Sequence, residues 1–366
     1  MTDPLFYKGI NLASDQLDTL ILSGAGYYGL IFCGIIKCLE EYKILPGIKY
    51  IYGVSAGTIF GLLIILGYSF AECMDLMTGD IDISRLVAVS GKDILNLATH
   101  FGINDGSYLE ESIKHILERK GYNPYITLGD LYEQTGIEYH LGVTLVFKEK
   151  FEMLSYKTRP DIPVWMAVRM SCSLPFIYYP IKDYELDDYV VDGGILNNTP
   201  LRFYLDTVIK ACPGLKSSNG KIMLDVGTQT GPEELESPGT AEPELITPAL
   251  DEGGQHYRMR FICVNTINIQ GAEDGQYPGY NNIKKSELAD ITLMDFISAF
   301  IHKLFYHQDC YQQKYKPYML DVNYAKYTFI SHTNLKITPE QIEILINDGF
   351  IAMEQYYRSH LILSTS

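Results

Sequence analysis

Short apolar runs and helical spacing alternate in the first part of the chain. Residues 17–23 form a short apolar run that ends in glycines, and residues 30–42 then carry apolar side chains at helical spacing. Residues 48–52 form a second apolar run, followed by a second helical pattern at residues 55–66. The pattern predicts strand, helix, strand and helix with tight connections, which is typical of a mainly parallel sheet with helices on both faces.

Further segments have the periodicity of helices or strands. We expect helices at residues 107–120, 127–134, 163–170, 287–305 and 338–357, and strands at 139–147, 150–156, 189–192, 221–226 and 259–265. Residues 80–106 contain only helical fragments, which could form a lid over an active site. Residues 228–254 are rich in Pro, Gly and Glu, so we expect a surface insertion there.

Residues 50–71 contain no charged residue and are numerous enough to span a bilayer. Four glycines and a serine interrupt this stretch, and its apolar pattern indicates a strand, a tight turn and a buried helix. A membrane span is the alternative interpretation.

The charge balance limits the partners of the chain. The formal net charge of -16 argues against a nucleic-acid surface and gives no attraction to anionic membranes. The seven cysteines have no Cys-x-x-Cys spacing, and the N-terminal residues lack the basic start and apolar run of a signal peptide. We expect a reduced protein that is cytoplasmic or peripheral to membranes, with secretion by a non-classical route left open.

The sequence Gly-Val-Ser-Ala-Gly at residues 53–57 has the spacing of a nucleophile elbow. Small residues at the positions of Gly53 and Gly57 allow a serine to occupy a strained turn between a strand and a helix. The patterns before and after it fit this context, so Ser55 is a candidate nucleophile at a helix N-terminus, where the dipole favours negative charge. An ordinary glycine turn is the alternative.

A glycine-rich loop at residues 23–29 follows the first predicted strand. Neighbouring parallel strands would bring this loop and the candidate nucleophile to the same edge of the sheet. The backbone N–H groups of Gly24, Ala25 and Gly26 are therefore candidate donors to an oxyanion. The loop also has Gly-x-Gly-x-x-Gly spacing, but the second strand does not end in the acidic residue of a dinucleotide site.

A serine nucleophile also needs a base, and an aspartate follows a predicted strand end. Asp192 comes directly before Gly193 and Gly194, which allow a close backbone approach. In an apolar pocket its carboxylate would gain basicity, so it could take the proton of a serine hydroxyl directly. An Asp-Gly turn without chemistry is the alternative.

Taken in order, these three blocks resemble the patatin-like phospholipase family. The oxyanion loop, nucleophile elbow and aspartate block of that family are similar to residues 24–26, 53–57 and 192–194. Residues 167–175 and 197–200 are similar to the stretches that flank the aspartate block. The resemblance is close over about residues 17–210.

The resemblance implies a three-layer α/β/α fold with a mainly parallel central sheet, in one domain over residues 1–366 that residues 255–366 complete. It also implies hydrolysis of acyl esters of phospholipids or related lipids, without a metal or cofactor, by a Ser-Asp dyad of Ser55 and Asp192. The chain departs from the family's pattern at Ala25, in place of a glycine, and at Tyr28, where a basic residue is usual. Since a tyrosine supplies no fixed positive charge, we expect lower turnover or a different head-group preference.

Two other functional interpretations stay open. A Ser-Asp-His triad could use His332 or His256, although its nucleophile would lie unusually near the N-terminus. A lipid-binding protein could retain the fold without turnover.

Two expectations concern metals and membranes. The sequence has no EF-hand loop or histidine-rich set, so we expect no metal site, and we interpret Asp187 and Asp188 as a solvated acidic turn. Because the chain is acidic, docking on a membrane or lipid aggregate should depend on apolar burial, through residues 80–101 or the helix at 287–305.

Overall fold

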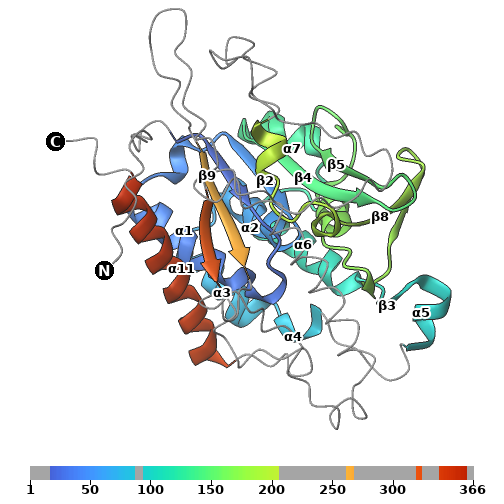
Figure 1. The fold of residues 1–366 in the computed structure, drawn as a ribbon, viewed down its shortest axis with the longest axis horizontal. Coiled ribbons are helices and arrows are strands. Elements are labelled where there is room, and N and C mark those ends of the chain that lie inside the picture. Colours follow the sequence, from blue (N-terminus) through green and yellow to red (C-terminus); the bar gives the residue numbers. More distant parts are fainter. Residues whose placement is uncertain (1–16, 87–93, 206–260, 268–318, 324–337, 361–366) are drawn as a thin grey trace, which may run out of the picture.

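The computed structural model describes residues 17–86, 94–205, 261–267, 319–323 and 338–360 (Figure 1). The segments expected at 221–226, 228–254 and 287–305 lie outside these ranges, as do His256 and His332.

Parallel strands form the centre of the described sheet. Their order is β10 (Met319–Asn323), β9 (Phe261–Ile267), β1 (Thr19–Leu22), β2 (Tyr50–Val54) and β4 (Glu138–Leu145). Three strands add antiparallel pairings: β5 (Lys150–Leu154) and β8 (Asp188–Asp192) pair with β4, and β7 (Ile181–Asp183) pairs with β8. The expected mainly parallel sheet is confirmed.

Buried residues form a cluster on each face of this sheet. Along β1, Leu20 and Leu22 belong to the larger cluster, whereas Ile21 belongs to the smaller one, as the alternation of side chains along a strand requires. The larger cluster includes residues of α1 (Ile31–Glu41), α2 (Ala56–Ile65), α8 (Val164–Ser171) and α11 (Pro339–His360). Helical residues 201–205 contribute two leucines to the smaller cluster. Helices therefore cover both faces, and the three-layer α/β/α fold is confirmed (Figure 1).

Along the sequence, the remaining helices fall between β2 and β4. They are α3 (Phe70–Asp75) with its π-helical extension η4 (Leu76–Asp80), α4 (Ile83–Leu86), α5 (Ile94–His100), α6 (Ser107–Arg119) and α7 (Leu128–Thr135). A separate pair of short parallel strands, β3 (Gly102–Asn104) and β6 (Phe176–Tyr178), was not predicted. Within the described ranges, no helix combines the length and the apolar character needed to cross a membrane. Residues 50–71 instead begin with β2 and continue into the 10-residue helix α2.

Helices α1 and α11 approach each other through two glycines. A Cβ at Gly34 would overlap the carbonyl oxygen of Ile346, and a Cβ at Gly349 would overlap that of Ile31. Overlap with backbone atoms cannot be relieved by a change of rotamer, so both positions require glycine for this packing. The last helix is thereby fixed against the first (Figure 1).

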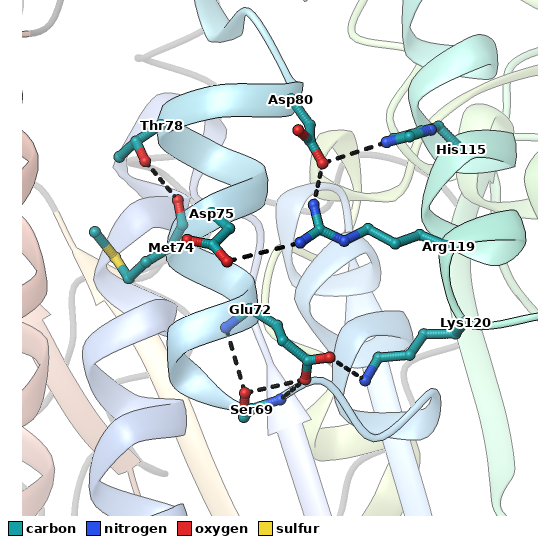
Figure 2. A network of polar contacts seen from close by, with 9 residues as sticks. All are labelled: Ser69, Glu72, Met74, Asp75, Thr78, Asp80, His115, Arg119 and Lys120. Carbon is teal, nitrogen blue, oxygen red and sulfur yellow. Dashed lines mark hydrogen bonds and ion pairs between the residues drawn. The ribbon is translucent and has the colours of Figure 1, made fainter.

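A polar network joins α6 to α3 and η4 (Figure 2). The guanidinium of Arg119 lies between the carboxylates of Asp75 and Asp80, which flank the π-helical turn. One residue further on, Lys120 pairs with Glu72 of α3 at 2.7 Å. A single ion pair at a protein surface contributes little to the free energy of unfolding. The ion pairs of Arg119 and Lys120 form a network, which helps to hold α3 in place relative to α6.

Candidate active site

The elbow predicted at residues 53–57 joins β2 to α2. Ser55 has φ 51° and ψ -126°, a strained backbone conformation for a residue with a side chain. A Cβ at Gly57 would overlap the carbonyl oxygen of Leu22 at the end of β1. A Cβ at Gly53 would lie 2.9 Å from a backbone nitrogen in the first turn of α2. The two glycines therefore provide the space that the elbow needs.

Hydrogen bonds to two neighbouring side chains hold the strained backbone of Ser55. Its N–H donates to Oγ of Ser171 on α8 at 3.0 Å, and the Ser171 hydroxyl donates to the Gly142 carbonyl of β4 at 2.6 Å. The hydroxyl of Thr58 donates to the Ser55 carbonyl at 2.6 Å. The Ser55 side chain does not cap α2, so its hydroxyl is available for other interactions.

Sheet register brings Asp192 level with the elbow. Val54 pairs with Gly142 across β2 and β4, and Val143 pairs with Asp192 across β4 and β8. The backbones of Ser55 and Asp192 are therefore two inter-strand spacings apart, a distance of about 10 Å. Side chains that point toward each other can bridge this gap.

The carboxyl group of Asp192 is almost completely buried, at 1% exposure. Burial raises its pKa from 3.8 to about 7, although the nearby Ser55 side chain and the Gly194 N–H both act to lower it. Oδ1 accepts the Gly194 N–H at 2.8 Å. The contact with Ser55 falls short of full hydrogen-bond geometry, and Oδ2 has no other partner in the described part of the chain. A carboxyl group with this pKa and one available oxygen can act as a general base near neutral pH.

Backbone contacts fix the position of the aspartate. The N–H of Asp192 donates to the Ser173 carbonyl at 2.9 Å, in the turn after α8. A Cβ at Gly193 would overlap the Gly142 carbonyl, so the aspartate block packs directly on β4. Gly142 thus contacts both the elbow, through Ser171, and the aspartate block.

The predicted oxyanion loop lies against Ser55, the candidate nucleophile. A Cβ at Gly24 would lie 3.2 Å from Cβ of Ser55 and would overlap Asn198 Oδ1. The Gly24 N–H, however, donates to the Asn198 carbonyl at 3.0 Å and is therefore occupied. The N–H groups of Ala25 and Gly26 have no backbone carbonyl partner among the described residues. They therefore remain the candidate oxyanion donors of this loop.

Tyr28 stands where the family pattern has a basic residue. Its side chain is half-buried and packs against the larger core cluster, and its N–H donates to the Ala25 carbonyl at 3.0 Å. It therefore shapes the loop through packing.

Arg169, for which no role was predicted from the sequence, supports the turn that carries the Ser173 carbonyl. Its side chain, at 2% exposure, donates to Oγ of Ser173 at 2.5 Å and to the carbonyl oxygens of Asp105 and Tyr179 at 3.0 and 3.1 Å. Burial lowers the pKa of this guanidinium. An arginine within the apolar pattern of a predicted helix was the available signal, since such a residue needs polar partners inside the fold.

The interpretation of Asp187 and Asp188 as a solvated turn holds only for Asp187. Asp188 is buried at 6% exposure and accepts the N–H groups of Phe147, Lys148 and Tyr189. Burial acts to raise its pKa, but these three donors lower it overall. Asp188 thus joins the ends of β4 and β8. Among the described residues, no cluster of three or more His, Cys, Asp or Glu side chains is placed to hold a metal ion.

Comparisons with known proteins agree with the fold. A family model described as patatin-like phospholipase matches residues 20–204, just over half of the chain. A probable lipid hydrolase of Invertebrate iridescent virus 6 is 28% identical over 189 residues, which cover 50% of this chain and 61% of that protein. A triacylglycerol lipase of Schizosaccharomyces pombe is 29% identical over 178 residues, 46% of this chain and 35% of that protein.

Other similar proteins add to the picture of the fold. An uncharacterised protein of Acanthamoeba polyphaga mimivirus is 31% identical over 200 residues, 54% of this chain and 65% of that protein. The chain therefore covers less than two thirds of each of these relatives. The crystal structure of VipD from Legionella pneumophila aligns with 94% of this chain and 67% of its own, at a TM-score of 0.51 and 18% identity. That similarity concerns the fold alone.

Proposed function

Since the chain belongs to the patatin-like phospholipase family, we propose that it hydrolyses acyl ester bonds of lipids through a Ser-Asp dyad. The observation that carries the proposal is the strained Ser55 beside a buried Asp192 whose pKa is about 7. Relatives named as a lipid hydrolase and a triacylglycerol lipase support a lipid ester as the substrate class. Within that class we propose phospholipids, cleaved with release of a fatty acid.

The first half of the reaction acylates the serine. Ser55 Oγ attacks the ester carbonyl carbon while its proton passes to Oδ2 of Asp192, which has no full hydrogen bond in the described structure. The N–H groups of Ala25 and Gly26 donate to the oxyanion of the tetrahedral intermediate. When the intermediate collapses, the bond to the leaving alcohol breaks and the alcohol takes the proton from Asp192.

The second half releases the acid. Water attacks the acyl carbon and gives a proton to Asp192, and collapse of the second intermediate breaks the bond to Ser55. The serine then regains its proton from Asp192, so the enzyme returns to its starting state. The proposed mechanism uses no third residue, because the base has a pKa of about 7 and can accept a proton near neutral pH.

A set of variants tests this mechanism. Ser55→Ala should abolish hydrolysis of a chromogenic ester and labelling by a fluorophosphonate, while its circular dichroism spectrum stays unchanged. Asp192→Ala should also abolish turnover, whereas His332→Ala and His256→Ala should retain it.

The same set separates the alternatives. Loss of activity in either histidine variant would support a triad, and absence of turnover in the wild type would support a lipid-binding protein. Labelling at a serine other than Ser55 would remove the assignment of the nucleophile.

Release of a fatty acid from a phospholipid tests the substrate class separately. If the enzyme cleaved triacylglycerol and left phospholipid intact, the proposed phospholipase activity would be wrong although the dyad would stand.

A further inference from the structure

Three aromatic side chains form a row at the surface, which we call the aromatic row: Phe101, Tyr189 and Phe147. The ring centroids of Phe101 and Tyr189 are 6.1 Å apart, and those of Tyr189 and Phe147 are also 6.1 Å apart, both in edge-to-face arrangements. Phe147 is 78% exposed and Phe101 58% exposed. The three residues come from different parts of the chain, so only the fold brings them together.

The aromatic row lies at the edge of the sheet that carries the proposed active site. Strand β4 continues from Gly142, the partner of Val54, to Leu145, and Phe147 follows it. Tyr189 lies three residues before Asp192 along β8, which corresponds to about 10 Å. The aromatic row therefore lies past Ser55 and Asp192 in the direction in which β4 runs, at the same edge of the sheet.

Two other exposed apolar side chains adjoin the row, and a third lies beyond Asp192. Val146 precedes Phe147, Phe176 pairs in register with Gly102 next to Phe101, and Leu196 follows the aspartate block. Their exposures are 40%, 38% and 42% for Val146, Phe176 and Leu196. Four of the nine large hydrophobic residues that are exposed in the described structure thus belong to the row or adjoin it, whereas single exposed apolar residues are ordinary at any protein surface.

The row is presented on a rigid support. His100 stacks on Tyr179 with centroids 4.7 Å apart, which fixes the end of α5 beside Phe101. Asp188 accepts the N–H groups of Phe147 and Tyr189. Phe101 has φ 60°, an uncommon conformation for a bulky residue, so the surrounding contacts hold its ring outward against backbone strain.

The charges beside the row are of both signs. Lys148 and Lys150 alternate with Glu149, Lys182 pairs in register with Tyr189, and the exposed Asp187 lies in the turn before β8. The whole chain carries a formal net charge of -16. A surface that is aromatic and flanked by mixed charge matches an uncharged lipid–water interface, where rings insert at the head-group level.

We propose that the aromatic row docks the protein on the surface of a zwitterionic lipid bilayer and so brings the sheet edge with Ser55 toward the substrate. This inference rests on the proposed function, because it takes the substrate to be a lipid in an aggregate. The sequence led us to expect docking through residues 80–101 or 287–305. In the surface proposed here, only Phe101 comes from the first of those segments, and the other two rings lie at the ends of β4 and β8.

Binding is tested without catalysis, on full-length Ser55→Ala protein and phosphatidylcholine vesicles in a sedimentation assay. Phe101→Asn combined with Phe147→Ser removes two rings, and asparagine tolerates the left-handed backbone at position 101. We expect the vesicle partition coefficient to fall at least tenfold. Tyr125→Ser, at a residue 60% exposed elsewhere on the surface, is the matched control and should bind as well as Ser55→Ala alone.

The outcomes discriminate between docking and catalysis. In an otherwise wild-type chain, the double variant should keep its turnover of a monomeric short-chain ester and lose turnover of vesicle phospholipid. Unchanged vesicle binding in the double variant would overturn the proposal. Binding that requires anionic lipid and disappears in high salt would also overturn it. The same holds if the wild type is a dimer and the double variant a monomer, because the row would then mediate self-association. If no ester is cleaved but the binding result holds, only the proposed function fails.

Discussion

Asn198 binds Gly24 twice: the Gly24 N–H donates to the Asn198 carbonyl, and Asn198 Nδ2 donates to the Gly24 carbonyl, each at 3.0 Å. The two hydrogen bonds join the loop after β1 to the segment that follows the aspartate block. The position of the Ala25 and Gly26 N–H groups therefore depends on a side chain 174 residues away from Gly24.

Asn198→Ala removes one of these bonds and leaves the Gly24 carbonyl without its side-chain donor. We expect kcat to fall by about 10- to 100-fold, since oxyanion donors must be held in place to stabilise a transition state. KM should change little, and the circular dichroism spectrum should stay that of the wild type. Asn197→Ala, the neighbouring half-buried asparagine, serves as the control. Equal turnover in both variants would show that the hydrogen bond between Asn198 and Gly24 does not contribute to catalysis.

Turnover should rise with pH through about 7, because only the deprotonated Asp192 can accept the proton of Ser55 and its pKa is about 7. The measurement is kcat/KM for a neutral soluble ester from pH 5 to 9. Activity that stays constant down to pH 5 would indicate that the carboxyl titrates as if exposed, and the assigned base would be wrong.

The same group makes a prediction about stability. The pKa of Asp192 is raised in the folded state, so the native protein binds more protons than the unfolded chain between about pH 4 and 7. Burial of the charge therefore lowers the free energy of unfolding as pH rises through this window, and the loss is complete above about pH 7. The rise in pKa from 3.8 to about 7 corresponds to at most roughly 4 kcal/mol.

Asp192→Asn should accordingly stabilise the protein at pH 8 and have little effect at pH 4, while it abolishes turnover. Urea unfolding at the two pH values measures the difference. A variant that is less stable than the wild type at pH 8 would show that the carboxylate makes favourable contacts that outweigh its burial.

Ser171→Ala should weaken both the fold and the chemistry. It leaves the Ser55 N–H and the Gly142 carbonyl without their partner, which costs about 1 to 3 kcal/mol for buried groups. Because the strained turn is then less firmly held, kcat should also fall. Ser112→Ala, at a buried serine of α6 that bonds the Tyr108 carbonyl, should lower stability without lowering kcat. A similar kcat in both variants would limit Ser171 to a role in stability.

Activity should survive excess EDTA, because the proposed chemistry uses only side chains and backbone donors. Turnover that is lost in EDTA and restored by calcium would contradict the mechanism. A calcium-bound chelator added to the wild type controls for effects of the chelator on the lipid substrate.

Local pattern was sufficient to predict much of the fold. The first two strands and helices, α6, α7, α8 and α11 each have an apolar periodicity that reports the face they bury, and the three glycine motifs are local in sequence. The short elements β3, β6, β7 and α3 were missed, since three to six residues are too few to show a period. Among them, α3 did carry a local signal, the capping box in which Ser69 precedes Glu72 by three residues.

The supporting contacts of the site could not be predicted for a different reason. Ser171 meets Ser55 across 116 residues, and Arg169 meets the Asp105 carbonyl across 64. Such pairings are set by strand register and helix packing, which periodicity does not encode. Asp188 was misread for the same reason, because two of its three donors, the N–H groups of Phe147 and Lys148, come close only when β4 and β8 are placed side by side.

Strand β1, which leads into the oxyanion loop, has β2 on one side and β9 on the other, and β9 comes from beyond residue 204, where the family match ends. A shortened protein that stopped there would leave one edge of β1 open and strip α11 from the glycine contact with α1. An open, apolar strand edge invites pairing with other chains. Expression of the matched region alone should therefore give aggregates, and we expect the later strands and the last helix to protect that region from association with other chains.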